Sequence, residues 1–244
     1  MNKDFYQGKN VWIIGATSGI GLALALQMSN LAKNVIISGR SNFKSEVKNI
    51  SFVRCDIAKI GDFENALDQI KSNFDQLDIL IFAAGIYEPM GLKNFNLKKS
   101  QEILEINFSG FLNVIQNLEA LQTQLKLSSL IVFSSIASYF GMPNSLCYGA
   151  SKAALNNITE SLFYELKGKV KVQLINPGFV KTRLTDKNNF KMPFMISDKE
   201  AAKIILKNIP KNKFEISFPA PFSWIMRFLK ILPHKARFWF LKSL

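Results

Sequence analysis

Short apolar runs alternate with longer segments of mixed polarity along most of the chain. The runs are bounded by turn residues and predict buried strands at residues 10–14, 35–38, 51–55, 79–83, 130–134 and 171–175. The longer segments carry apolar residues at helical spacing and predict helices at residues 20–31, 63–74, about 97–125 and about 148–166. Apolar strands that alternate with helices indicate a parallel sheet covered on both faces.

This alternation predicts the α/β class, with one doubly wound parallel sheet in a single domain at residues 1–218. Its crossover connections should be right-handed. No repeat or low-complexity linker divides this part of the chain. Residues 219–244 are expected to form a C-terminal appendage.

The appendage is both basic and aromatic. Residues 219–244 contain five Lys or Arg and no Asp or Glu, interleaved with Trp, Phe and aliphatic residues. The pattern predicts one or two amphipathic helices broken near Pro233, with too many charges to span a membrane. Three roles are open for this segment: contact with a membrane surface, closure of a substrate pocket, or contact between subunits.

The composition excludes several classes of protein. The chain has 244 residues, of which 48% are apolar, as is typical of a globular protein with a sizeable core. With two cysteines, Cys55 and Cys147, and one histidine, His234, neither a disulfide framework nor a metal site is expected. No signal peptide follows Met1 and no uncharged apolar stretch reaches about 18 residues, so a cytoplasmic protein is expected.

The net charge of +13 is typical of solvated lysine-rich faces. The basic residues are scattered and match no recognition motif, so no nucleic-acid partner is expected. An anionic membrane surface is the alternative partner, because the appendage is basic.

A glycine-rich turn joins the first predicted strand to the first predicted helix. Glycines at these positions allow a tight turn and let the backbone approach a pyrophosphate. The helix N-terminus then offers free N–H groups and a partial positive charge to the anion. We therefore predict that a dinucleotide contacts Gly15, Thr17, Ser18, Gly19, Ile20 and Gly21.

A second group of residues has the chemistry of proton transfer. Tyr148 and Lys152 are four residues apart and share one face of a predicted helix. A phenol has an unperturbed pKa of about 10, which a nearby cation lowers by favouring the phenolate. Ser135, just after the fifth strand, can hold a substrate oxygen as charge develops, and Ser134 is the neighbouring alternative.

Together these motifs, in this order, resemble the short-chain dehydrogenase/reductase family in its single-domain form of about 250 residues. The resemblance runs from about Lys9 to Thr182 and implies a Rossmann-type fold and an oxidoreductase that interconverts a carbonyl and an alcohol. It implies that Asn107, Ser135, Tyr148 and Lys152 form the catalytic tetrad, with Asn107 anchoring a water.

The resemblance also implies how the cofactor binds. Where NAD-preferring members place an acid after the second strand, this chain has Gly39 followed by Arg40, so NADP(H) is expected in preference to NAD(H). Two departures are Ile14, where the family often has threonine, and Phe82-Ala83, where it has two asparagines. The further expected contacts are Asp56, Ile57, Ala83, Ala84, Gly85, Tyr148, Lys152, Pro177, Gly178, Val180 and Thr182.

Substrate residues are expected in loops at the carboxyl ends of the strands. Residues 184–196 are rich in Phe and Met and predict a lid over a small lipophilic substrate, although such residues also pack on a domain whatever the substrate. The candidates are Ile136, Phe140, Met142, Pro143, Phe179, Phe190, Met192, Phe194 and Met195.

The family pairs two helices of each subunit in a four-helix bundle, so a homodimer or homotetramer is expected. The apolar positions taken for this contact are Phe111, Val114, Leu118, Leu155, Ile158 and Leu162. Two other functions stay open: a module that senses NADPH without turnover, and another chemistry on the same fold, such as epimerisation or dehydration.

Overall fold

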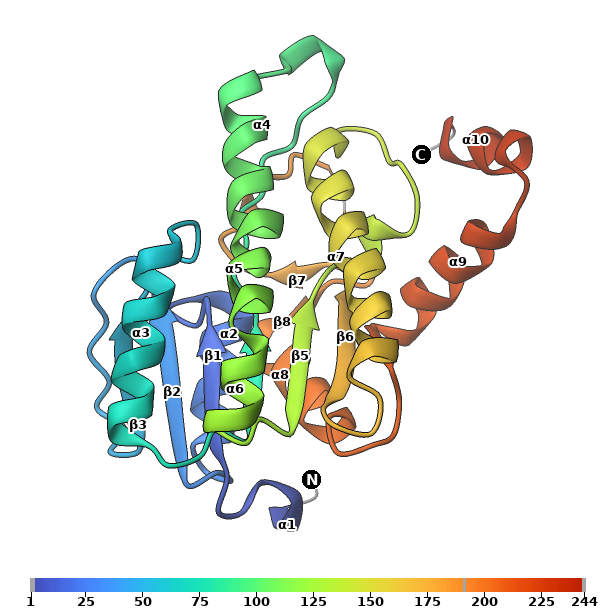
Figure 1. The fold of residues 1–244 in the computed structure, drawn as a ribbon. Coiled ribbons are helices and arrows are strands. Elements are labelled where there is room, and N and C mark those ends of the chain that lie inside the picture. The colour runs from blue at the N-terminus through green and yellow to red at the C-terminus, as the bar shows by residue number, and fades with distance from the viewer. Residues whose placement is uncertain (1–2, 191, 243–244) are drawn as a thin grey trace.

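The computed structural model describes residues 3–190 and 192–242. Within these residues, seven parallel strands form one sheet in the order β3-β2-β1-β4-β5-β6-β9 (Figure 1). Met1 and Asn2, Lys191 of the expected lid, and Ser243 and Leu244 of the appendage lie outside the described residues. The strands are β1 (Asn10–Ile14), β2 (Asn34–Gly39), β3 (Ile50–Arg54), β4 (Ile79–Phe82), β5 (Ser129–Phe133), β6 (Lys171–Pro177) and β9 (Glu215–Phe218).

Helices cover both faces of the sheet, as the alternating pattern predicts. In Figure 1, α3, α5, α6 and α7 lie in front of the sheet and α2 and α8 behind it. Each face has its own apolar core, and β1, β4 and β5 are buried along their whole length. The helices are α1 (Lys3–Tyr6), α2 (Gly19–Met28), α3 (Ile60–Asn73), α4 (Leu97–Leu104), α5 (Gly110–Gln116), α6 (Leu118–Gln124), α7 (Leu146–Glu165), α8 (Asp198–Asn208), α9 (Ala220–Ile231) and α10 (His234–Lys242).

The strand order reverses between β1 and β4, which are hydrogen-bonded neighbours although β2 and β3 come between them in sequence. In such sheets the loops diverge at this point and leave a crevice beyond the carboxyl ends of the strands. The topology therefore places the glycine turn after β1 beside the loop after β4.

The predicted helix at about 97–125 is not continuous. A π-helical turn, η2 (Glu105–Ser109), separates α4 from α5, and Asn117 separates α5 from α6. The apolar pattern runs through all three helices, so the sequence shows no break there. π-turns of this kind are frequent at functional sites.

Strand β9 and helix α8 are absent from the sequence prediction. Strand β9 is short, and its Glu215 masks the apolar pattern. In the structure Glu215 accepts hydrogen bonds from Tyr139 and, at 2.8 Å, from Asn176, and it lies 2.9 Å from Arg227 of α9. These long-range partners explain a carboxylate in an edge strand.

Helix α9 packs on the domain through one face. Met226 and Leu229 are buried against Ile136 and Tyr139, which follow β5. The opposite face is apolar too but exposed; it comprises Trp224, Ile225, Phe228 and Ile231. The division of the chain at residue 218 stays a prediction, since α9 shares a hydrophobic cluster with the preceding domain. None of the described helices combines the length and apolar content that a membrane crossing needs.

The residues taken for a subunit contact face inward. Phe111, Val114, Leu118 and Leu155 are buried in the core, because α5, α6 and α7 cover the sheet with these side chains. Ile158 and Leu162 are partly buried against the same core. These side chains are therefore apolar because they pack on the sheet, and they give no support for a dimer.

Candidate active site

A cavity of about 400 Å³ opens at the carboxyl ends of the parallel strands. Its size is in the range usual for ligand sites. All the expected cofactor contacts line it, from the glycine turn at Gly15 to Thr182, and so does Ser135. Gly39 and, from the expected lid, Leu184, Thr185 and Lys187 also line it, and sequence reasoning missed Cys55, Ile86, Ile106, Phe133 and Arg183.

The glycine turn is packed too tightly for side chains. Gly15 has φ of +85°, and a Cβ there would lie 2.5 Å from the Cα of Ala84. A Cβ on Gly21 would lie 2.5 Å from the carbonyl oxygen of Gly15. Ser18 precedes α2 but makes no side-chain capping bond, so its hydroxyl satisfies none of the first N–H groups of the helix. The cradle thus fits the pyrophosphate of a dinucleotide.

The end of β2 has no room for the acid found in NAD-preferring proteins. A Cβ on Gly39 would lie 2.6 Å from Cγ2 of Thr17. Arg40 is the next residue, is exposed and lines the cavity. The close contact of Thr17 with Gly39 therefore excludes an acidic side chain at position 39, and the guanidinium of Arg40 lies at the rim of the cavity.

Helix α7 and the loop after β5 bring three of the four expected catalytic residues to the cavity wall. Lys152 is 4% exposed, and its Nζ donates a hydrogen bond to the carbonyl oxygen of Phe133 at 3.0 Å. The same Nζ lies 5.9 Å from the ring centroid of Tyr148. Ser135 is within hydrogen-bond reach of the Tyr148 hydroxyl.

The two serines differ in what they contact. The Ser134 hydroxyl is buried and donates to the backbone oxygen of Lys152 at 2.8 Å. The Ser135 hydroxyl accepts from Ala137 N at 3.1 Å and faces Tyr148. The geometry favours Ser135 over Ser134 as the group that meets a substrate oxygen.

Burial is the largest influence on the pKa values of Tyr148 and Lys152. It raises the pKa of the Tyr148 phenol, and the hydrogen bond with Ser135 lowers that pKa in part. Burial also lowers the pKa of Lys152 to about 8, because a buried ammonium loses its hydration. The net shift of the Tyr148 pKa is upward because burial is its largest cause, and a lowering of this pKa by Lys152 stays a prediction.

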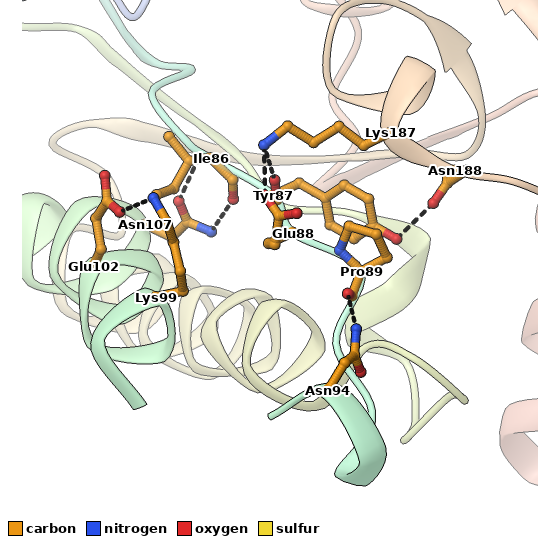
Figure 2. Close-up of polar contacts among 10 residues, drawn as sticks. All are labelled: Ile86, Tyr87, Glu88, Pro89, Asn94, Lys99, Glu102, Asn107, Lys187 and Asn188. Atoms are coloured by element: carbon orange, nitrogen blue, oxygen red, sulfur yellow. Dashed lines mark hydrogen bonds and ion pairs between the residues drawn. The ribbon is translucent and has the colours of Figure 1, made fainter. Parts of the chain in front are cut away.

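Asn107 lies in the π-turn behind the cavity wall. It is fully buried, and its carboxamide bonds both backbone groups of Ile86: Oδ1 accepts from Ile86 N at 2.7 Å and Nδ2 donates to Ile86 O at 3.0 Å. Nδ2 also lies 3.1 Å from Ser151 Oγ on α7. Figure 2 shows the paired bonds to Ile86. Asn107 thus connects the loop after β4 to the helix that carries Tyr148 and Lys152.

A segment at residues 182–188, here called the strap, forms another part of the cavity wall. Its end is fastened to the loop after β4 by three hydrogen bonds (Figure 2). Lys187 Nζ donates to Tyr87 O at 2.9 Å and to Glu88 Oε2 at 2.7 Å, and the Tyr87 hydroxyl donates to Asn188 Oδ1 at 2.7 Å. Sequence reasoning placed Lys187 in the expected lid without giving it a role, and it did not select Tyr87.

Aromatic side chains of the residues that flank the strap in sequence pack against the start of α9. The ring of Phe222, at the start of α9, stacks on Phe179 with centroids 5.2 Å apart, and Phe190 meets Phe179 edge-on at 5.9 Å. A Cβ on Gly178 would lie 2.7 Å from the Phe222 ring. The appendage is thus in contact with Gly178, one of the expected cofactor contacts. Among the described residues, no three His, Cys, Asp or Glu side chains are grouped to hold a metal ion.

Comparison with known proteins agrees with this geometry. The profile of the short chain dehydrogenase family matches residues 9–193. An uncharacterized oxidoreductase of Myxococcus xanthus is 29% identical over 232 residues, or 91% of this chain and 92% of the relative. The 3-oxoacyl-[acyl-carrier-protein] reductase FabG of Rickettsia bellii is 31% identical over 216 residues, or 85% of this chain and 83% of that protein.

The fold matches a solved protein over nearly its full length. A short chain dehydrogenase from Burkholderia cenocepacia, crystallised in complex with NADP, has a TM-score of 0.82 at 22% identity, covering 92% of this chain and 94% of that one. Because the family profile spans most of the chain, the conclusion rests on sequence as well as fold. The chain belongs to the short-chain dehydrogenase/reductase family of NAD(P)-dependent oxidoreductases.

Proposed function

We propose that this protein interconverts a carbonyl and an alcohol on a lipophilic substrate, with NADP(H) as cofactor and Tyr148 as general acid/base. The observation that carries the proposal is the meeting of Ser135, Tyr148 and Lys152 at one end of a dinucleotide cradle. When bound, the cofactor supplies or accepts the hydride.

The side chains supply the rest of the reaction. The Ser135 hydroxyl donates a hydrogen bond to the substrate oxygen as negative charge develops. Tyr148 passes its proton to that oxygen, and its raised pKa keeps it protonated for reduction. Lys152 is held by Phe133 O at 3.0 Å and would contact the ribose of a bound cofactor, and Asn107 holds the wall behind Tyr148 and Lys152. In the oxidative direction Tyr148 takes the proton back.

The preference for NADP(H) is supported by the end of β2. A 2′-phosphate is bound by a guanidinium, whereas a free 2′-hydroxyl calls for an acid, and this chain has Arg40 and no room for an acid at Gly39. The test is fluorescence titration of NADPH and NADH. Arg40→Ala should weaken NADPH binding and leave NADH binding unchanged; equal losses for both would contradict the preference.

The apolar substrate is supported by the aromatic cluster of Phe179, Phe190 and Phe222 beside the strap. The test is consumption of NADPH with 3-oxoacyl thioesters, medium- and long-chain aldehydes, steroids and quinones. Tyr148→Phe is the control, since it keeps the ring and removes the proton. Turnover that disappears in this variant supports the proposal. Full turnover in Tyr148→Phe refutes the role of the tyrosine, and tight NADPH binding without any turnover favours a cofactor-binding module.

The exposed face of α9 is assigned to an anionic membrane surface. It carries Trp224 and Phe228, which are 67% and 57% exposed, beside the exposed cations Arg227 and Lys230. Tryptophan and basic residues on one exposed helix are typical of the membrane interface. Deleting the appendage would also remove Phe222 from Gly178, so the test is Trp224→Gln/Phe228→Gln, which leaves the buried face intact. Unchanged co-sedimentation of this variant with anionic vesicles would count against membrane contact.

We still propose a homodimer or homotetramer, but with a subunit contact made by other residues than those expected from the sequence. The outer faces of α4 and α5 expose apolar side chains that the core does not use, at Leu104 and Leu112. Sedimentation equilibrium of the wild type and of Leu112→Glu tests this contact. A monomer in the wild type would refute it.

A further inference from the structure

Tyr87 is a second tyrosine beside the proposed proton donor. It follows β4 by five residues and is half-buried. Its ring meets the ring of Tyr148 edge-on, with centroids 4.8 Å apart and an interplanar angle of 76°. Aromatic pairs in this arrangement attract each other beyond their buried area. The ring of Tyr87 therefore restricts where the ring of Tyr148 can lie.

The hydroxyl of Tyr87 has its hydrogen-bond partner on the strap. It donates to Asn188 Oδ1 at 2.7 Å, at the end of the strap (Figure 2). Burial, together with Tyr148 and Glu88, raises the pKa of Tyr87 to about 12. Tyr87 thus stays a neutral donor near neutral pH and is not a second proton source for the cavity.

One side chain therefore joins two parts of the site that are far apart in the chain. The strap lines the cavity from Thr182 to Lys187, and Asn188 at its end is held by Tyr87. The neighbouring Lys187–Glu88 ion pair is exposed on both sides, at 44% and 42%, so it holds the strap weakly. The Tyr87–Asn188 bond is half-buried and better shielded from water.

We propose that Tyr87 is a positioning residue that holds the Tyr148 ring toward Ser135 and makes this orientation depend on closure of the strap. The inference rests on the proposed function, because Tyr87 acts through Tyr148. Opening of the strap would free the Tyr87 hydroxyl, loosen its ring and weaken the Ser135–Tyr148 hydrogen bond. That bond lowers the pKa of Tyr148 and burial raises it, so a Tyr148 ring that moves should ionise at a shifted pH.

The test compares Tyr87→Phe, which keeps the ring and removes the bond to Asn188, with Asn188→Ala and with the double variant. Tyr164→Phe is the matched control, since Tyr164 is 73% exposed and its ring contacts Phe163 outside the cavity. The readouts are kcat, NADPH binding and the ionisation of Tyr148. The last is obtained as the tyrosinate absorbance of each variant minus that of the same variant carrying Tyr148→Phe, and it requires no substrate.

We expect each single variant to lower kcat by about tenfold, as small misplacements of a reacting group do, and to shift the ionisation of Tyr148. The double variant should be no worse than either single variant, because both remove the same bond. Tyr164→Phe should match the wild type.

Multiplicative losses in the double variant, or lost stability and NADPH binding with an unmoved ionisation of Tyr148, would overturn the proposal. If the wild type turns over no substrate yet the ionisation of Tyr148 is shifted in both single variants, the positioning stands and the proposed reaction fails.

Discussion

Substituting Gly15 tests the physical basis of the cofactor cradle most directly. An alanine there keeps the φ of +85° that the turn requires, which costs about 1–2 kcal/mol for a residue with a Cβ. Its Cβ would also lie 2.5 Å from the N and Cα atoms of Ala84. These are backbone atoms in the loop after β4, so they cannot rotate away, and overpacking of this kind costs about 1–3 kcal/mol. Gly15→Ala should therefore lower the free energy of unfolding by about 2–5 kcal/mol.

Gly61→Ala is the matched control. Gly61 lies in the first turn of α3 with no other atom within 4 Å of a built Cβ, and its φ is not positive. The same change should stabilise the protein there by about 0.4–1 kcal/mol, because alanine has less freedom in the unfolded chain. The assay is urea unfolding followed by fluorescence, with NADPH titration on the folded proteins. A Gly15→Ala protein as stable as the wild type, or one that binds NADPH normally, would refute the reasoning.

Three further predictions concern charge, cofactor choice and the appendage. Burial lowers the pKa of Lys152 to about 8 from 10.5, so the unfolded chain holds the extra proton between these values. The stability of the wild type relative to Lys152→Met should therefore rise with pH from about 8 to about 10.5, and a flat difference in urea unfolding would contradict this. Gly39→Asp should improve NADH binding, measured by titration, only together with Thr17→Ser, which removes the methyl group 2.6 Å from the new Cβ. Improved NADH binding in the Gly39→Asp single variant would show that the Thr17 side chain can move aside. Phe222→Ala should destabilise the protein by about 2 kcal/mol, roughly half the cost at a fully buried site. It should also weaken NADPH binding through Gly178, whereas the exposed Phe228→Ala should do neither.

Much of the fold follows from local patterns. The six predicted strands are present in the sheet, within a residue or two at their ends, because buried parallel strands are apolar throughout. Strand β9 was beyond this reasoning, since Glu215 is explained only by Tyr139, Asn176 and Arg227. The break at Glu105–Ser109 was missed for a similar reason, because apolar periodicity does not distinguish a π-turn from an α-turn.

For the candidate site, spacing along the chain determined the cradle and the Tyr148–Lys152 pair. Both depend on a single turn or a single helix, where residues close in sequence are close in space. Tertiary structure decided which serine faces the phenol, that burial raises the pKa of this phenol, and that the apolar residues of α5 and α7 serve the core. It also decided that Tyr87 meets Asn188, which is 101 residues away. Such contacts depend on how whole elements pack and on which groups lose water, and neither is recorded in the local sequence.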